Sequence, residues 1–358
     1  MSDILGLGGL TVSESALLAL SLVILLLFLV TIAFSGYAII LRARHERKEA
    51  LWEKLSAKWE EPVLSVIMDP DQIPATQALV SSEHRLHFVR FVLEYTRRVK
   101  GEERETLRKL AHPFLEGVVA QTRDRRSEIR TRAIQTLGTL GLPAYGDHVV
   151  AGLEDPSPLV SMVAARYLAR KEFPQYSIHV LNHLDRFEGW NRRFFASMLA
   201  AMGPEVSPRL RDGLESEETA SWLRSVYAEA LWMQADPLSA DIAASALATA
   251  EDRDLLAALL RLIASVGYHD HLEAVRQHCS STDVVVRAQA LHALGLLGDE
   301  REIPMLREAM YDGSPWTALH AARGVKEAGG ADVLKEIAES DHPNAKLAGQ
   351  VLYEEDDS

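Results

Sequence analysis

The sequence predicts an all-α protein in which an α-solenoid of short helical hairpins follows a single transmembrane helix. Two observations support this prediction. An apolar position recurs about every 31 residues through most of the chain, and an uncharged stretch long enough to cross a bilayer precedes the repeats. In addition, the apolar residues within each repeat have helical spacing.

The repeat is clearest when Leu294 is taken as an anchor. Equivalent apolar positions are separated by 31 or 32 residues, and the anchors are Leu137, Leu168, Leu199, Leu231, Ile263, Leu294 and Val325. Each anchor has another apolar or aromatic residue four positions before it. Five of the seven anchors are followed four positions later by glycine, and we expect these glycines to end the helix in a left-handed conformation. A second apolar helix follows, so about seven units stack into one array.

Residues Asp124 to Gly141 read D-R-R-S-E-I-R-T-R-A-I-Q-T-L-G-T-L-G. This stretch resembles the HEAT repeat, in the short form that includes the bilin-lyase-type HEAT repeats, and the resemblance covers roughly residues 124–352. It implies an α-solenoid in which an acidic residue and an arginine form a ladder between neighbouring units. Asp124 with Arg130 and Glu218 with Arg224 match that pattern, and Arg192 and Arg287 keep the arginine. Ser161, Leu256 and Ala318 depart from it, so we expect an incomplete ladder.

These patterns divide the chain into six segments. They are a short extracytoplasmic amino terminus (1–14), a transmembrane helix (15–41), a juxtamembrane basic amphipathic helix and hinge (42–74), amino-terminal capping helices (75–123), the HEAT-like repeat array (124–352) and an acidic tail (353–358). Two longer amphipathic helices are expected within 84–99 and 103–122, outside the later period. Terminal units of a solenoid are atypical because one side has no neighbour.

The stretch from Ser15 to Leu41 contains no charged residue, and about 20 residues of helix cross the hydrocarbon core. A secretory signal peptide is the alternative, but it has a basic start and a shorter apolar core. Four basic residues follow the stretch, namely Arg42, Arg44, Arg47 and Lys48, and no basic side chain precedes it. The positive-inside bias therefore predicts a single-pass inner-membrane protein with its amino terminus outside and its repeats in the cytoplasm.

The juxtamembrane segment leaves two interpretations open. Trp52 and Trp59 share one side of a helix with Leu51 and Leu55. That side lies on the bilayer surface or a partner helix, or else the two tryptophans pack onto the first helices of the repeat domain. Prolines at positions 62, 70 and 74 predict that residues 61–74 break the helix and form a hinge.

Charge and motifs exclude several classes of function. The net charge is −13, and a nucleic-acid-binding surface needs a basic stripe. The local cluster at Arg123, Arg125, Arg126, Arg130 and Arg132 fits phospholipid headgroups or an acidic partner better than a duplex. The acidic tail is interpreted as solvated.

No catalytic constellation is evident, so we expect a protein that is not an enzyme and has no cofactor or metal. A HEAT-family iron enzyme resembling deoxyhypusine hydroxylase uses paired His-Glu dipeptides, and the dipeptide here, His45-Glu46, precedes the array. His269-Asp270-His271 is interpreted as a helix start more readily than as a metal site. Cys279 would be a nucleophile only with a base and an orienting group nearby.

The sharpest functional prediction concerns one face of the anchor helices. If these helices line the concave side, as in known HEAT arrays, positions nine, five and two before each anchor share an exposed face. The partner-binding residues predicted there are Trp190, Phe194, Trp222, Arg261, His292, Trp316, His320 and Arg323. Interface centres are enriched in Trp and Arg, although each Trp could equally cover the core between units.

The sequence therefore predicts a membrane-anchored cytoplasmic scaffold that binds a protein partner at the inner membrane. An envelope polysaccharide synthase, a secretion complex and a signalling complex are examples of such a partner. The alternative is a HEAT protein of the bilin-lyase type that holds a small molecule or chromophore in its groove. The lipid bilayer is the second expected partner.

Overall fold

The computed structural model describes residues 14–140, 143–170 and 174–354, and every regular element within those ranges is a helix. Most of the segment predicted to be extracytoplasmic (residues 1–13), the predicted helix-ending Gly141 and the last residues of the acidic tail lie outside the described residues. The chain divides into two compact units, residues 1–117 and residues 118–358.

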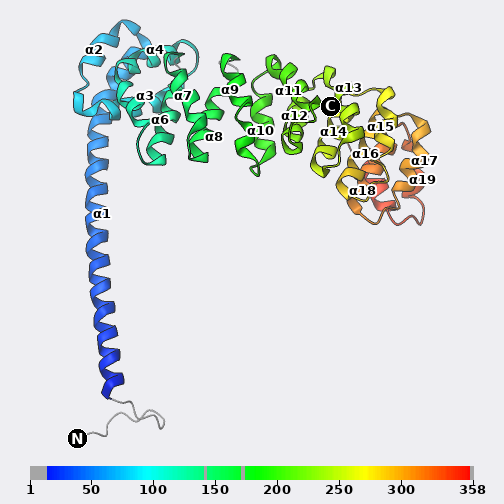
Figure 1. Cartoon of the computed structure of the whole chain (residues 1–358), viewed down its shortest axis with the longest axis horizontal. Coiled ribbons are helices and arrows are strands. Elements are labelled where there is room, and N and C mark those ends of the chain that lie inside the picture. The colour runs from blue at the N-terminus through cyan, green and yellow to red at the C-terminus, as the bar shows by residue number, and fades with distance from the viewer. Residues whose placement is uncertain (1–13, 141–142, 171–173, 355–358) are drawn as a thin grey trace. The chain divides into compact units, whose positions relative to one another are not determined.

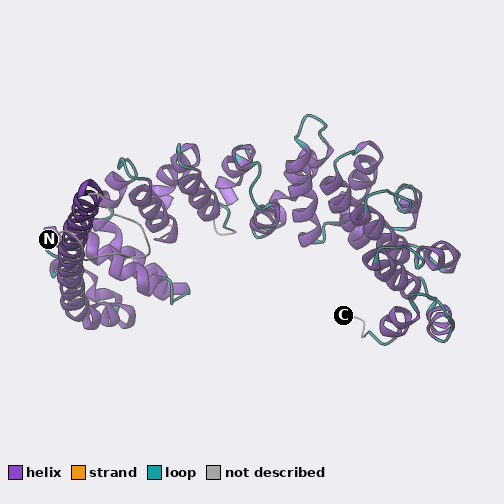
Figure 2. Ribbon diagram, turned by 90° about the horizontal axis from the view of Figure 1, so that it is seen from below, coloured by secondary structure: helices purple, strands orange, loops and turns teal. Residues whose placement is uncertain are grey.

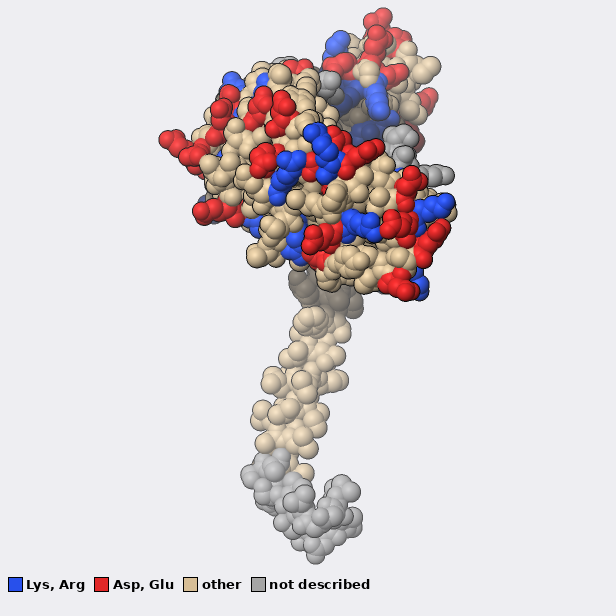
Figure 3. All heavy atoms as spheres, turned by 90° about the vertical axis from the view of Figure 1, so that its right-hand side faces the viewer, with Lys and Arg blue, Asp and Glu red and all other residues tan. Residues whose placement is uncertain are grey.

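The first unit begins with α1 (Glu14–Met68). Its apolar part is a candidate membrane span, with a mean hydropathy of 3.1 and no residue of that stretch buried in the protein. The corresponding part of the helix bears no Lys, Arg, Asp or Glu in Figure 3. An apolar helix that stays uncovered along its whole circumference is stable in lipid but not in water.

The same helix continues past the predicted hinge. Pro62 lies inside α1, so the predicted break there is wrong, and the chain leaves the helix at Asp69. A proline in a helix interior costs about 3 kcal/mol. Trp59, Val63 and Val66 are buried around it, and each of these side chains offsets part of that cost by leaving water.

The other helices of this unit cover the carboxyl-terminal part of α1. They are α2 (Ile73–Ala78), α3 (Arg85–Thr96) and α4 (Gly101–Ala111). The second predicted capping helix is interrupted, because the 3-10 turn His112–Phe114, which contains a proline, separates α4 from α5 (Glu116–Gln121).

The second unit contains two rows of helices (Figures 1 and 2). The anchor row holds α6 (Ser127–Leu140), α8 (Pro158–Leu168), α10 (Arg192–Ala200), α12 (Ser221–Gln234), α14 (Arg253–Val266), α16 (Val284–Leu297) and α18 (Pro315–Glu327). The other row holds α7 (Gly146–Ala151), α9 (Ser177–Leu181), α11 (Ser207–Glu215), α13 (Ala240–Thr249), α15 (Leu272–Arg276), α17 (Ile303–Ala309) and α19 (Ala331–Ala338). The final helix is α20 (Ala345–Leu352). Short 3-10 turns begin most units of the second row.

The repeat anchors form the core between the rows. All seven lie in the anchor row, and none exposes more than 3% of its surface. The residues four positions before them are buried as well, from Ala133 in α6 to Ala321 in α18. A period of 31 or 32 residues returns the same helix face to the same environment, so the predicted all-α solenoid is confirmed.

The expected role of the repeat glycines is only partly correct. Gly203 and Gly329 have positive φ values of 98° and 87°, which favour glycine. Gly203, with a ψ of 180°, is nevertheless not in the left-handed helical conformation. Gly267 and Gly298 have φ values of −75° and −86°. A Cβ atom at these two positions would lie 2.4 Å and 2.6 Å from the carbonyl oxygens of Ile263 and Leu294, the anchors themselves. Glycine is required there by close packing against the end of the helix.

Arginine–aspartate pairs connect successive units. The Nε of Arg130 donates to Asp155 at 2.7 Å, and the Nε of Arg287 donates to Asp312 at 2.7 Å. In both pairs the carboxylate comes from the following unit. Arg224, which the sequence predicted to pair with Glu218, differs from this pattern, because its Nε donates to the carbonyl oxygen of Leu214. These arginines hold the array together.

We expect Asp312→Asn to lower the free energy of unfolding by about 1.5 kcal/mol, because a charge-assisted bond becomes a neutral one. The side chains of Arg287 and Asp312 are each 18% exposed. The matched control is Glu336→Gln. Glu336 pairs with Arg307, and the side chains of Glu336 and Arg307 are 64% and 45% exposed. This control should change the free energy of unfolding by less than about 0.5 kcal/mol. Chemical denaturation of the intact protein measures both, and equal effects would contradict a structural ladder.

Candidate functional site

Three tryptophans mark the candidate site at the start of anchor-row helices. Trp190 precedes α10, whereas Trp222 and Trp316 lie in the first turns of α12 and α18. Trp190 is 39% exposed, Trp316 is 49% exposed and Trp222 is half-buried. Their shared register therefore places three large apolar side chains at the surface of the array, which is where a binding partner could cover them.

The position five residues before the anchor differs from the prediction. Val226 and Ala258 are fully buried, and His320 is 7% exposed. The helices that carry Val226, Ala258 and His320 pack against neighbouring anchor-row helices, so these side chains face a helix instead of solvent. Phe194 and Gln289, at the same position of their units, are half-buried. His320 is therefore not an exposed partner-binding residue.

His320 belongs to an aromatic cluster between α16 and α18. Its ring centroid lies 4.6 Å from that of Trp316 and 5.3 Å from that of His292. Neither ring nitrogen of His320 has a hydrogen-bond partner among the described residues. Burial, with the nearby His292 and Arg323, lowers the pKa of His320 to about 4, so the ring is neutral at pH 7.

The two arginines predicted for the site are paired within the array. Arg261 of α14 donates to Glu229 of α12 at 2.8 Å. The Nε of Arg323 donates to Glu354 at 2.9 Å, and this bond lowers the pKa of the Glu354 carboxyl group. Both guanidinium groups thus connect segments of the array, and a partner would have to compete with an internal carboxylate for either of them.

Phe194 lies beside a pocket that sequence reasoning did not identify. The pocket has a volume of about 460 Å³ and is lined by Arg166, Ala169, Arg170, Phe194, Ser197, Met198 and Ala201. Arg166 lies two positions before the anchor Leu168, which is one of the three positions used to predict the binding face in the later units. The same rule applied to the unit of Leu168 predicts Arg166 as a site residue.

The predicted membrane-interface residues fall into two groups. Arg42, Arg44, Arg47 and Lys48 are exposed on α1. Trp59 is 1% exposed, and its ring lies 5.2 Å from Phe88 and 5.9 Å from Phe91 of α3.

Trp52 contacts Phe91 as well and carries the guanidinium of Arg90 over its ring at 4.5 Å. Of the two interpretations, packing onto the following helices is the one observed. The assignment of Trp59 to the membrane interface is wrong, because aromatic side chains of α3 cover it. Trp52 is half-buried by the same helix.

The carboxyl-terminal part of the array matches a known family. Residues 240–326, which hold α13 through nearly all of α18, match the family of HEAT repeats. This part of the array consists of HEAT repeats. No curated protein matches the sequence.

Three solved structures are among those similar to this chain. The complex of CpcE and CpcF of phycocyanin lyase from Nostoc sp. PCC7120 is 17% identical, with a TM-score of 0.33, over 66% of this chain and 86% of that chain. Kap121p bound to Pho4p is 12% identical, with a TM-score of 0.46, over 81% of this chain. An engineered protein is 15% identical, with a TM-score of 0.38, over 83% of this chain and 99% of that chain. This chain spans 39% of the length of Kap121p.

The histidines at positions 269 and 271 organise a turn between HEAT repeats. The Nδ1 of His271 accepts from the Tyr268 amide at 3.0 Å, and its Nε2 lies 2.9 Å from Asp241. His269 lies 3.1 Å from the Nη2 of Arg301. The cluster is thus a helix start, as the sequence favoured.

Cys279 has the environment of a structural thiol. Burial raises its pKa to about 12, and its Sγ lies 3.7 Å from the carbonyl oxygen of Val275. A thiol with so high a pKa forms little thiolate at pH 7, and the thiolate is the nucleophile.

Proposed function

We propose that this protein is a membrane-anchored cytoplasmic scaffold whose HEAT repeats bind a protein partner at the inner membrane. The observation that supports it most is the row of tryptophans in one register, in which Trp190 and Trp316 are exposed and Trp222 is half-buried. Large aromatic side chains bury much apolar surface against a partner, and only a few of their side-chain torsions become fixed on binding. Such side chains are therefore enriched at the centres of protein interfaces.

The first unit supports the anchoring part of the proposal. The apolar stretch of α1 is uncovered by the rest of the protein, and the exposed residues Arg42, Arg44, Arg47 and Lys48 follow it directly. Basic residues beside a span favour the cytoplasmic side, so we infer an amino terminus outside and HEAT repeats inside. Arg42 and His45 each pair with a glutamate one helical turn later, which leaves Arg44, Arg47 and Lys48 to face lipid headgroups.

The test is affinity purification of the intact protein from its native membrane in mild detergent. A variant with Trp190→Ala, Trp222→Ala and Trp316→Ala should lose a partner that the unchanged protein retains. The matched control carries Leu238→Ala, Tyr268→Ala and Tyr311→Ala, which are 69%, 52% and 62% exposed and lie outside the tryptophan register. The control should retain the partner, and circular dichroism should show unchanged helix in both variants.

Two outcomes would contradict the scaffold. One is recovery of the same proteins with all three forms, because the tryptophans would then only cover the core between repeats. The other is a purified protein without a protein partner but with a visible absorption band or a bound small molecule, which would favour the bilin-lyase-type alternative.

A further inference from the structure

The anchor row is interrupted at one place. Successive anchor helices pack side by side from α6 to α8 and from α10 through α12, α14 and α16 to α18, but α8 and α10 make little direct contact. The pocket of about 460 Å³ lies there, with the end of α8 and the residues just after it on one side and α10 on the other. The space between these two helices is therefore a hollow at a position that the rest of the row fills with packed side chains.

The walls of this hollow combine apolar and cationic groups. Met198 and Ala169 are buried at its base, and Phe194 is half-buried beside them. Arg166 is exposed and makes no ion pair with any residue within the described ranges. Arg170 is held in place, because its guanidinium lies 4.5 Å over the Tyr167 ring and its Nη1 donates to the Gly138 carbonyl at 3.3 Å. A pre-positioned guanidinium loses little entropy when it binds a carboxylate.

The charge around the hollow is opposite to that of the protein. The chain has 51 acidic and 38 basic residues, yet α6, α8 and α10 together carry five arginines and a single acid, Glu128. Two of these arginines are paired, Arg130 with Asp155 and Arg192 with Asp254. Arg132, Arg166 and Arg193 are exposed and form no ion pair in the part of the chain that the structure describes, so they can contact a ligand. An acidic ligand is repelled by most of the surface and attracted here, which provides specificity as well as affinity.

We propose that the hollow between α8 and α10 binds an acidic segment of the protein partner, with a carboxylate between Arg166 and Arg170 and a neighbouring apolar side chain against Phe194 and Met198. This inference rests on the proposed scaffold function and names the chemistry of the partner. A free phosphate would use the arginines but would leave the apolar base in water. A peptide with both acidic and apolar side chains uses both parts of the pocket.

The test measures binding of a labelled peptide to the intact protein in mild detergent by fluorescence anisotropy. The probe is a short peptide that alternates glutamate with phenylalanine, and the same peptide with lysine for glutamate is the reference. We expect the acidic peptide to bind with an affinity that falls as salt rises, and the lysine peptide not to bind. Arg166→Glu should weaken binding at least about tenfold.

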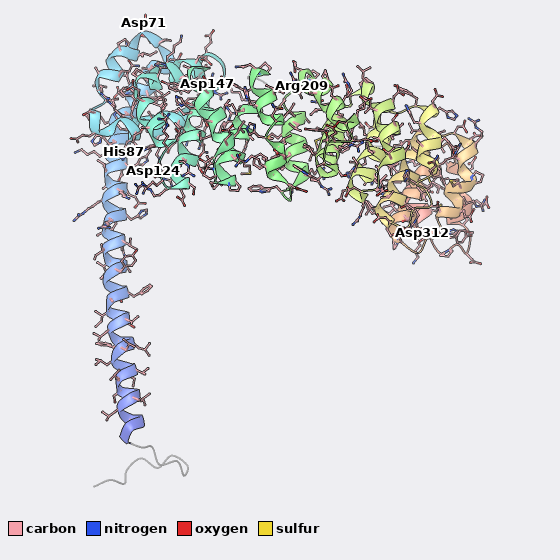
Figure 4. All side chains as sticks on the ribbon, in the orientation of Figure 1. Asp71, His87, Asp124, Asp147, Arg209 and Asp312 are labelled. Carbon is pink, nitrogen blue, oxygen red and sulfur yellow. The ribbon has the colours of Figure 1, made fainter. Side chains whose placement is uncertain are left out.

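Two further variants separate the pocket from general charge. Arg209→Glu makes the same charge reversal at an exposed arginine of α11, on the other row of the array (Figure 4), and should leave binding unchanged. Ser197→Trp fills the hollow without changing charge and should also weaken binding about tenfold. Equal affinity in all variants would overturn the inference, and so would an effect of Arg166→Glu without one of Ser197→Trp.

Competition experiments distinguish an acidic peptide from the other ligands that the hollow can hold. Displacement of the peptide by inorganic phosphate at concentrations comparable to the peptide would indicate a simple anion site and overturn the inference. Partner capture that depends on the three tryptophans but not on Arg166 would leave the scaffold standing and the acidic-segment site rejected. Capture that depends on neither would reject both.

Discussion

Replacing Gly295 with alanine should destabilise the array by about 2 to 3 kcal/mol, even though alanine is the better helix former. Gly295 lies in the interior of α16, where the change to alanine would ordinarily stabilise a helix by about 1 kcal/mol. The added Cβ atom would lie 2.2 Å from the Cα of Gly324 and 2.6 Å from its carbonyl oxygen. Backbone atoms of α18 cannot rotate away, so the two helices must separate, and the loss of packing exceeds the gain in propensity.

The matched control for this prediction is Gly349→Ala in α20. There the new Cβ would meet Ala338 at 3.7 Å, an ordinary contact, so helix propensity decides and stability should rise by up to about 1 kcal/mol. Opposite signs for the two variants are the expected result. Denaturation of the intact protein measures the size of each effect, and hydrogen exchange should locate the first one in α16 and α18. A neutral Gly295→Ala variant would show that α16 and α18 do not approach closely in solution.

The second large effect is expected from His320 as the pH falls. The pKa of this histidine is lowered from 6.5 to about 4, first by burial and then by His292 and Arg323. Between these two values the unfolded chain binds a proton that the folded chain does not. The contribution of neutral His320 to the free energy of unfolding is therefore fully present above pH 6.5, and it decreases as the pH falls towards 4. We expect a loss on the order of 2 kcal/mol, less than the full shift implies, because the ring keeps some contact with solvent.

The variant His320→Phe should flatten this pH dependence. It keeps a ring beside Trp316 while removing the titrating group and two ring nitrogens without hydrogen-bond partners. His179→Phe, at an exposed histidine of α9, is the matched control and should keep the slope of the unchanged protein. Residual slope in His320→Phe is expected from His292, whose pKa is also lowered by burial.

A second acidic transition is separate from that of His320. The Asp312 carboxyl group has its pKa lowered below 3.8 by Arg287, so its contribution to stability is lost only as the pH falls through that lower value. Equal slopes between pH 6.5 and 4 for the unchanged protein and for His320→Phe would contradict the assignment to His320.

Periodic features could be predicted from the sequence because they repeat a local rule. The seven anchors were placed by spacing alone, and all of them are buried in the anchor row. Spacing works here because each unit packs mainly on its nearest neighbours, so position within the repeat determines environment. The same reasoning placed Trp190 and Trp316 at the surface.

Features that depend on packing between segments could not be predicted from the spacing of apolar residues. The periodicity that identified the repeat does not say which side of an anchor helix meets the next helix, so His320 was expected at the surface and is buried. Proline was expected to end α1, but burial of the aromatic and apolar side chains around Pro62 outweighs its local cost.

The sequence by itself determined that this protein is an array of HEAT-like helical repeats preceded by a long apolar helix, because periodicity and hydropathy are properties of short segments. Only the tertiary structure decided which register positions stay exposed, where α16 and α18 meet at two glycines, and that α8 and α10 leave a hollow between arginines. These depend on the distance between neighbouring helices, which the side chains of both helices set together.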